Sequence, residues 1–175
     1  FLEKQAGWDF EISTVTEPTP LGTGGALVYS SSFCTTDLLL VINGDTLLQV
    51  DLSQFIESHI RTGLAASIMC AAVDDTSRSG KVTITNGRVT EFREKEESTG
   101  KMSYTNAGAY LFDRKLINQL PIPNSCSLEK DLLPLILEYG LSAFTKGVRF
   151  LDIGTPENLV LANKSWNEYG SSTLP

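Results

Sequence analysis

Residues 37–72, DLLLVINGDTLLQVDLSQFIESHIRTGLAASIMCAA, decide the fold. The run 37–43 is apolar throughout and bounded by turn signals, which is typical of a strand buried on both faces, as in parallel sheets. Apolar residues then recur at helical spacing after Asp51, a good N-cap, and stop at Gly63. A second apolar run covers 65–72. Strand, helix and strand in this order predict a βαβ unit in a Rossmann-like, mixed and mostly parallel sheet flanked by helices.

The segments around this unit extend the α/β pattern. Residues 10–16 alternate as a strand does, and the sequence KVTITNGRVTEF predicts an antiparallel hairpin with a type I′ turn at Asn86-Gly87. The other expected elements are a helix over about 24–33, a strand over 103–112, a helix with Leu128, Leu132, Leu135 and Ile136 on its apolar face, a strand over 149–153 and a helix opened by Thr155-Pro156-Glu157. We therefore expect one α/β domain over residues 1–175.

Composition narrows the class of protein. The chain has 175 residues, 41% of them hydrophobic and 20% charged, which suits one soluble domain with a substantial core. A net charge of −7 argues against nonspecific binding to nucleic acid or anionic membranes. No apolar run approaches a membrane span of ~20 residues. Cys34, Cys70 and Cys126 are distant and odd in number, so we expect reduced thiols in a cytoplasmic protein.

The stretch EPTPLGTGGAL, residues 17–27, has two interpretations. Glycine lets a ligand approach the backbone, and a helix N-terminus offers unpaired N–H groups, so the loop could hold a nucleotide. It could equally be a tight connection between two packed elements.

Two aspartates follow predicted strands. Asp45 comes after the run 37–43, where Gly44 permits a sharp exit, and Asp152 comes after another apolar run and precedes a glycine turn. Ligands in open α/β sheets bind at the carboxyl ends of strands, and Mg²⁺ favours one or two carboxylates plus phosphate oxygens. The two residues are candidate Mg²⁺ ligands; the alternatives are a turn aspartate and a helix cap.

Other candidates lie on strands and loops. Glu94 and Lys95 end the second hairpin strand, where a lysine can neutralise a phosphate, although a charged surface loop is the alternative. Asn106 and Gly108 interrupt a long strand, and glycine there often marks the close approach of a ligand or of another backbone segment. Glu129 sits in a first helical turn, where favourable placement in the helix dipole is the alternative explanation.

His59 is the one histidine in the sequence. It lies one position off the apolar stripe of its helix, and no neighbouring sequence feature supports a catalytic triad or a metal site. We expect it to be structural or exposed.

In order, the motifs PLGTGGAL, LLLVINGD, VTEFREK, TNAGAYLF, SLEKDLLP and FLDIGTPENL resemble the sugar-1-phosphate nucleotidyltransferases. Within that family the chain is most similar to bacterial heptose 1-phosphate guanylyltransferases, over residues 10–163. The resemblance implies an enzyme of nucleotide-sugar biosynthesis, for example for cell-surface polysaccharide. In its reaction the phosphate of a sugar 1-phosphate attacks the α-phosphorus of a nucleoside triphosphate and releases pyrophosphate.

The resemblance also implies roles for residues. Leu21, Gly22 and Thr23 match the loop against the nucleotide, Asp45 and Asp152 match the Mg²⁺ ligands, and Glu94 and Lys95 match residues that bind the sugar and its phosphate. Asn106 with Gly108 matches a turn that contacts the sugar, and Glu129 matches a position near the sugar.

One departure from the family is large. The family's N-terminal strand and its glycine-rich GGxGTRL loop, which carry the groups that grip the triphosphate, do not occur in this sequence. We therefore expect a fragment with exposed apolar surface, which would favour homo-oligomers. The alternative is a truncated, inactive relative that binds a sugar nucleotide or a partner protein. A metal-dependent glycosyltransferase is a third possibility, but NGDT supplies no DxD motif.

Overall fold

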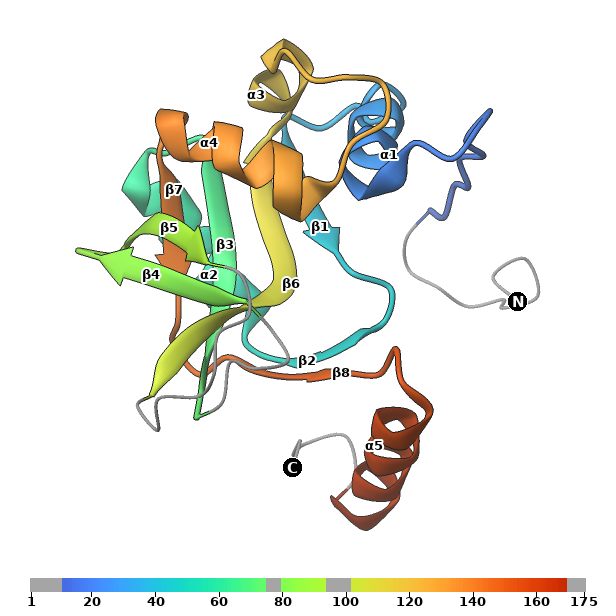
Figure 1. Cartoon of the computed structure of the whole chain (residues 1–175), viewed down its shortest axis with the longest axis vertical. Coiled ribbons are helices and arrows are strands. Elements are labelled where there is room, and N and C mark those ends of the chain that lie inside the picture. The colour runs from blue at the N-terminus through green and yellow to red at the C-terminus, as the bar shows by residue number, and fades with distance from the viewer. Residues whose placement is uncertain (1–10, 75–79, 94–101, 170–175) are drawn as a thin grey trace.

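The computed structural model describes residues 11–74, 80–93 and 102–169, which form a mixed sheet with helices on both faces (Figure 1). The mixed α/β fold expected from the sequence is confirmed. In chain order the elements are α1 (Gly22–Ser31), β1 (Leu38–Ile42), β2 (Thr46–Gln49), α2 (Leu52–Thr62), β3 (Ala66–Val73), β4 (Lys81–Thr85), β5 (Arg88–Arg93), β6 (Ser103–Asp113), α3 (Arg114–Gln119), η2 (Leu128–Leu132), α4 (Leu133–Tyr139), β7 (Leu141–Phe144), β8 (Arg149–Asp152) and α5 (Pro156–Tyr169).

The main sheet has six strands in the order β1-β6-β3-β7-β5-β4. Strands β3 and β7 pair in parallel, whereas β6 runs antiparallel to β1, to β3 and, over a short stretch, to β4. Strands β1 and β3 therefore point in the same direction and are joined through α2, as the predicted βαβ unit requires. A separate antiparallel pair, β2 with β8, lies beside the main sheet.

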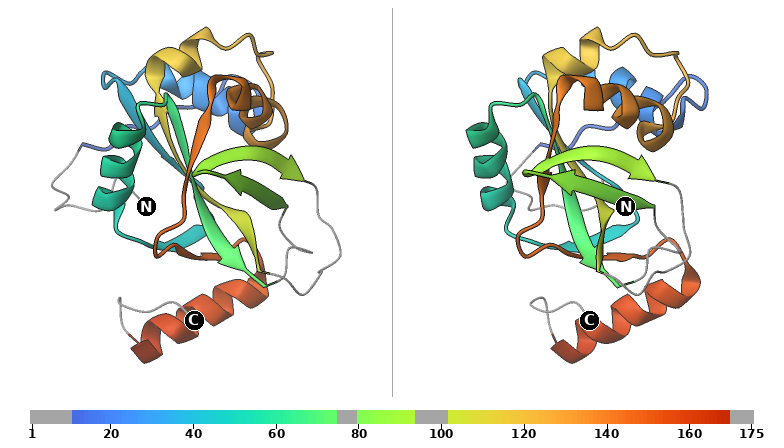
Figure 2. Two further views of the ribbon diagram at one scale, coloured as in Figure 1. Left: turned by 90° about the vertical axis from the view of Figure 1, so that its left-hand side faces the viewer. Right: turned by 60° about the vertical axis from the view of Figure 1, so that its left-hand side comes forward.

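Helices cover the sheet on two faces, as Figure 2 shows from two further directions. On one face α2 packs through Phe55 against apolar side chains of β3, β6 and β7. On the other face, α3, η2 and α4 bury a larger core that contains Tyr110 and Phe112 of β6, and Leu27 and Val28 of α1 pack against it. The sheet is thus the middle layer of the molecule.

Local sequence signals account for several element boundaries. The Asp51 carboxylate accepts a hydrogen bond from the backbone N–H of Gln54 at 3.1 Å, and α2 ends at Gly63, which has a φ of 64°. The hairpin turn places Asn86 at a φ of 51° and Gly87 at 75°, the left-handed conformations that a type I′ turn requires. These predicted caps and this predicted turn are confirmed.

The helix predicted from the leucines of 128–136 begins with a π-helical turn. In η2 the backbone N–H of Leu132 donates to the carbonyl oxygen of Ser127, five residues back, at 3.1 Å. A π-turn adds one residue to the helical repeat, so the apolar face shifts by one position. Leu133 is consequently fully buried beside Leu132, while Leu135, expected on the apolar face, is only partly buried.

Two expectations about strands were wrong. The described part of the segment 10–16 is exposed and forms no strand, because alternation produces a strand only where another strand pairs with it. The run 37–43 was expected to be buried on both faces, but among the described residues β1 is an edge strand whose one partner is β6. Its Leu40 is 40% exposed and its Ile42 is 46% exposed. Continuous apolar sequence does not distinguish a central strand from such an edge.

The three cysteines are free, as predicted from their spacing. Burial raises the pKa of the Cys70 thiol to about 12, and burial followed by the charge of Asp131 raises the pKa of Cys126. Both thiols are therefore neutral near pH 7. Among the described residues, no helix combines the length and apolar character needed to cross a membrane.

Candidate functional site

Two carboxylates come together where β2 and β8 meet. Asp45 precedes β2, and Asp152 ends β8, where it pairs with Thr46. A backbone hydrogen bond of 2.8 Å from the N–H of Ile153 to the carbonyl oxygen of Asp45 fixes the two segments side by side. Both aspartate side chains are exposed, so they are accessible to a ligand from solvent.

Gly154 lies between these carboxylates. A Cβ at this position would be 3.1 Å from Oδ1 of Asp152 and 3.1 Å from Oδ2 of Asp45, so the two oxygens lie within about 6 Å of each other. The backbone N–H of Gly154 donates to Asp152 Oδ1 at 2.8 Å, and the other carboxylate oxygen remains available. Two such oxygens fit the one or two carboxylates that Mg²⁺ takes from a protein. The described residues contain no group of three or more acidic, histidine or cysteine side chains that could hold a metal by themselves.

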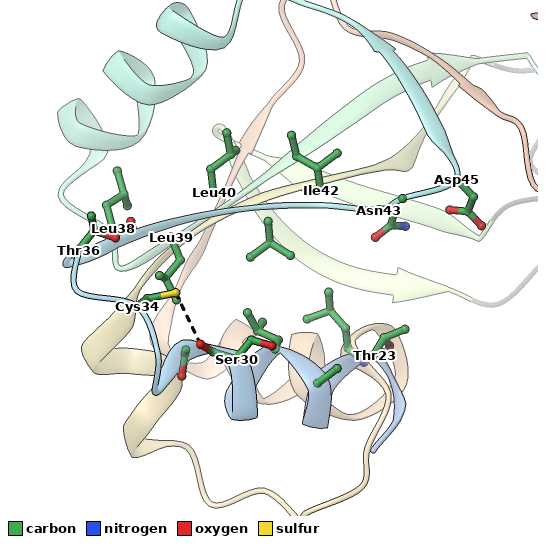
Figure 3. A pocket seen from close by; sticks show the side chains of 16 residues that line it. Thr23, Ser30, Cys34, Thr36, Leu38, Leu39, Leu40, Ile42, Asn43 and Asp45 are labelled. Atoms are coloured by element: carbon green, nitrogen blue, oxygen red, sulfur yellow. Dashed lines mark hydrogen bonds between the residues drawn. The ribbon is translucent and has the colours of Figure 1, made fainter. Parts of the chain in front are cut away.

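A cavity of about 860 Å³ separates α1 from β1 (Figure 3). Thr23 stands at the start of α1, and Gly44 and Asp45 lie where the chain leaves β1. Leu39 points towards α1, whereas Leu40 and Ile42 point to the opposite side of the strand. The predicted loop residue Thr23 and the predicted metal ligand Asp45 therefore line the same cavity.

Close packing explains all three glycines of the loop; a Cβ at Gly22 would come within 2.6 Å of the Cys126 carbonyl oxygen. The backbone N–H groups of Gly24 and Gly25 both donate to the carbonyl oxygen of Cys126, at 2.9 and 3.2 Å. A Cβ at Gly24 would come within 2.8 Å of Cys126 Sγ, and one at Gly25 within 2.5 Å of the Asn124 carbonyl oxygen. These two N–H groups are thus occupied by the protein itself and are not available to a ligand. Gly22, with a φ of 70°, and Thr23 remain exposed at the rim.

A second cavity, of about 460 Å³, lies between the hairpin, β6 and η2. Asn106 and Glu129, which the sequence analysis assigned to the sugar, both line this cavity. Apolar groups, among them Val82, Phe92 and Leu133, form part of its wall. Positive charge comes from the described residues Lys81, Arg93 and Lys130. The cavity therefore offers positively charged side chains that can bind an anion. Beside them it offers an amide and a carboxylate that can bind hydroxyl groups.

A hydrogen bond connects the two cavities. The Thr23 hydroxyl, which lines the first cavity, donates to Oε2 of Glu129, which lines the second, at 3.2 Å. The Ser127 hydroxyl donates to the same oxygen at 3.2 Å. Thr23 also accepts a hydrogen bond of 2.8 Å from the backbone N–H of Leu128. The predicted loop residue and the predicted sugar-side carboxylate thus share one wall.

Gly108 is a point of close approach, as its place inside a strand suggested. It has a φ of 72°, and a Cβ there would lie 2.9 Å from Asn43 Nδ2 and 3.0 Å from Thr46 Oγ1. Its carbonyl oxygen accepts a hydrogen bond of 2.9 Å from the backbone N–H of Asn43. The neighbour that makes glycine necessary is therefore the chain leading to Asp45.

The remaining predicted site residues lie elsewhere. Leu21 lines a third cavity, of about 400 Å³, together with Pro18, Val28 and Ile122. It is therefore not grouped with Thr23 and Asp45. Glu94 and Lys95 fall outside the described residues, and their predicted roles stay predictions.

His59 is structural, as expected. It is 5% exposed, its Nδ1 lies 2.7 Å from Ser67 Oγ, and its Nε2 lies 3.7 Å from Asp113 Oδ1. Ser67 Oγ in turn lies 2.7 Å from Ser142 Oγ. Burial lowers the pKa of His59, and the nearby charge of Asp113 offsets part of that shift. Ser67 is 1% exposed, so this cluster is closed to substrates.

Sequence reasoning missed several residues at the two cavities. Asn43 stands directly before the Gly-Asp pair, and its position in that motif was a usable signal. Lys81 and Lys130 line the second cavity, but isolated lysines carry no signal in a sequence. Tyr110, whose hydroxyl contacts Asn106, was not found because its register depends on an irregularity of β6.

The chain is similar to proteins of known activity. The family model described as nucleotidyl transferase matches residues 2–168. The chain is 32% identical over 154 residues to the mannose-1-phosphate guanylyltransferase of Mycobacterium tuberculosis, which covers 86% of this chain and 43% of that protein. It is 31% identical over 155 residues to the D-glycero-alpha-D-manno-heptose 1-phosphate guanylyltransferase of Aneurinibacillus thermoaerophilus, which covers 87% of this chain and 66% of that protein.

Solved structures give the same picture. HddC from Yersinia pseudotuberculosis matches with a TM-score of 0.81 and 31% identity, over 94% of this chain and 71% of that chain. The same protein in complex with GMP-PN matches with a TM-score of 0.76 and 32% identity, over 87% of this chain and 65% of that chain. The chain spans between about two fifths and two thirds of the length of the two curated relatives described above.

Proposed function

This chain belongs to the nucleotidyl transferase family, and we propose that it transfers a nucleoside monophosphate from a nucleoside triphosphate to a sugar 1-phosphate. GTP and heptose 1-phosphate are the proposed substrates, because similar proteins carry the name heptose 1-phosphate guanylyltransferase. Mannose 1-phosphate is a second candidate acceptor, because other similar proteins carry the name mannose-1-phosphate guanylyltransferase. The observation that carries the proposal is the pair of carboxylates around Gly154, at the edge of a cavity that shares a wall with a second, cation-lined cavity.

The reaction is an in-line displacement at phosphorus. An oxygen of the sugar 1-phosphate forms a bond to the α-phosphorus of the triphosphate, while the bond from that phosphorus to the bridging oxygen breaks and pyrophosphate leaves. Both substrates are highly anionic, so the barrier is dominated by charge and by positioning rather than by covalent chemistry of the protein.

The residues of the chain divide this work. Asp45 and Asp152 are the proposed ligands of Mg²⁺, which would neutralise phosphate charge when bound. Lys81 and Lys130, which line the second cavity, are the proposed cations for the anionic end of the sugar 1-phosphate, with Lys95 as a further predicted cation. Asn106 and Glu129 offer an amide and a carboxylate to the hydroxyl groups of the sugar.

Pyrophosphate release by the full-length protein tests the proposal. GTP is supplied with heptose 1-phosphate or mannose 1-phosphate, with and without Mg²⁺. We expect Asp45→Asn and Asp152→Asn each to reduce turnover by about 100-fold or more, because bound metal contributes several kcal/mol of charge stabilisation. Asp37→Asn is the matched control, since this carboxylate is 88% exposed and contacts Arg114. Full Mg²⁺-dependent activity in either site variant would show that the metal assignment is wrong.

An inactive relative that binds only a sugar nucleotide is the alternative function. Calorimetric titration of the full-length protein with a GDP-sugar distinguishes the two. Binding of the sugar nucleotide without pyrophosphate release from any substrate pair would favour the alternative.

A further inference from the structure

Strand β6 contains an irregularity between Asn106 and Tyr110. In the β3–β6 pairing, Ile68 lies opposite Tyr110 and Cys70 lies opposite Asn106, so two steps along β3 correspond to four steps along β6. Gly108 sits in the extra length, with a φ of 72°. Residues two apart on a regular strand share a face and lie about 7 Å apart. Asn106 and Tyr110 are four apart in sequence, but they lie opposite residues of β3 that are only two apart, so they are held at this shorter spacing.

The irregularity brings two side chains into contact. Asn106 Nδ2 donates a hydrogen bond to the Tyr110 hydroxyl at 2.6 Å. The backbone N–H of Gly108 donates to Asn106 Oδ1 at 2.9 Å. A flipped amide would turn its NH₂ group towards the Gly108 N–H, donor against donor, so the orientation of the Asn106 amide is fixed.

Tyr110 is a rigid anchor for that amide. Its side chain is fully buried, and its ring stacks on Phe112 with the ring centroids 5.7 Å apart. Burial raises the pKa of the Tyr110 phenol, the hydrogen bond from Asn106 opposes this shift, and the Glu129 carboxylate raises the pKa further. The hydroxyl is therefore protonated, with Asn106 on one side and the Glu129 carboxylate close by.

Asn106 and Glu129 together match the chemistry of a sugar. Both line the second cavity, where the amide has a second N–H to donate and the carboxylate has oxygens to accept. A hydroxyl group donates one hydrogen bond and accepts others, so neighbouring hydroxyls of a sugar pair with this combination. A site of this kind discriminates strongly against a ligand that lacks the hydroxyl, because its polar groups are then left unpaired.

We propose that Tyr110 is a positioning residue for the sugar: its hydroxyl, brought beside Asn106 by the irregularity in β6, fixes the amide so that Asn106 and Glu129 present one donor and one acceptor to adjacent sugar hydroxyls. The inference rests on the proposed function and adds a residue that does not line either cavity among the described residues. Tyr110 acts through Asn106 and does not touch the reacting phosphates.

Tyr110→Phe in the full-length protein tests the inference, because it removes the hydroxyl and keeps the ring. We expect the KM for the sugar 1-phosphate to rise about tenfold, the equivalent of one lost hydrogen bond. In the same variant, the KM for GTP and the kcat should each change by less than about twofold. Tyr104→Phe, a half-buried tyrosine on the same strand, is the matched control and should leave both KM values unchanged.

A double-variant cycle separates positioning from a general structural role. If Tyr110 acts through Asn106, Tyr110→Phe should have no further effect on the sugar KM in an Asn106→Ala background. Additive effects, or equal increases in the KM values for GTP and for the sugar 1-phosphate, would overturn the inference. So would a Tyr110→Phe variant that behaves as Tyr104→Phe does.

A direct binding measurement keeps the test of Tyr110 separate from the test of the proposed function. Absence of pyrophosphate release by the unsubstituted protein contradicts the proposed function alone. In that case heptose 1-phosphate and mannose 1-phosphate are titrated calorimetrically. Weaker binding by Tyr110→Phe than by Tyr104→Phe supports the positioning role, and equal binding, or no binding by either variant or by the unsubstituted protein, overturns it.

Discussion

Single residues at this site are constrained by what surrounds them. Gly108 and Gly154 both lie where a Cβ would crowd a neighbouring polar group, Asn43 in one case and the carboxylates of Asp45 and Asp152 in the other. The two aspartates could be picked out from the sequence because each follows an apolar run and has a glycine within two residues, Gly44 before Asp45 and Gly154 after Asp152. The partners of Gly108 could not, because they come from a distant part of the chain.

His59 gives a prediction about pH. Burial lowers its pKa in the folded protein, so the unfolded chain takes up a proton more readily. The folded protein therefore loses stability through His59 as the pH falls below about 6.5, the ordinary pKa of histidine. The loss is complete once the pH lies below the lowered pKa of the folded state. Urea unfolding at pH 7.5 and 5.5 measures this loss. We expect His59→Gln to lose less stability than the unsubstituted protein between these values, and equal losses would contradict the assignment.

At the scale of elements, the ends of helices could be predicted from the sequence, whereas irregularities inside helices and strands could not. Asp51 and Gly63 delimit α2 as expected, because a cap and a left-handed glycine act locally. The π-turn of η2 and the irregularity in β6 were not predictable from periodicity, since each adds residues that shift the pattern. For this reason sequence reasoning missed Leu133, which follows the π-turn, and Tyr110, which follows the irregularity in β6. It also assigned a strand to residues 10–16, whose described part forms none.

The π-turn gives a prediction about stability. The shifted register buries Leu133 fully in the core, whereas Leu135 is only partly buried at the edge of the core. We expect Leu133→Ala to lower the free energy of unfolding by about 2–5 kcal/mol, the range for a buried leucine, and Leu135→Ala to lower it by less. Denaturant unfolding of both variants measures the difference. A larger loss for Leu135→Ala would mean that the helix keeps a regular α-helical register.

At the scale of the whole molecule, β1 is an open edge of the six-stranded sheet. It pairs with β6 on one side, and its Leu40 and Ile42 are 40% and 46% exposed. An exposed apolar edge strand is a template for pairing with another chain. The mixed sheet was predictable from the order of strands and helices, but the position of β1 at the edge was not, because its apolar run resembles that of a central strand.

This edge predicts self-association of the 175-residue chain. We expect its mass in solution, measured by light scattering after gel filtration, to exceed 19.1 kDa as the concentration rises. Leu40→Lys should shift the chain towards the monomer, because a charge on an edge strand opposes pairing. Ile60→Lys, at a 68% exposed position on α2, is the control and should have no such effect. A monomer at every concentration would contradict the prediction.

The hydrogen bond between Thr23 and Glu129 has a consequence for how the two cavities fill. A ligand in one cavity that strengthens or weakens this bond changes the free energy of binding in the other. Thermodynamic linkage requires the change to be the same in both directions, so the factor by which a nucleotide alters the affinity for the sugar phosphate equals the factor by which the sugar phosphate alters the affinity for the nucleotide. Any change that a ligand in one cavity makes to the Thr23–Glu129 hydrogen bond would therefore appear, by the same factor, in the affinity of the other cavity.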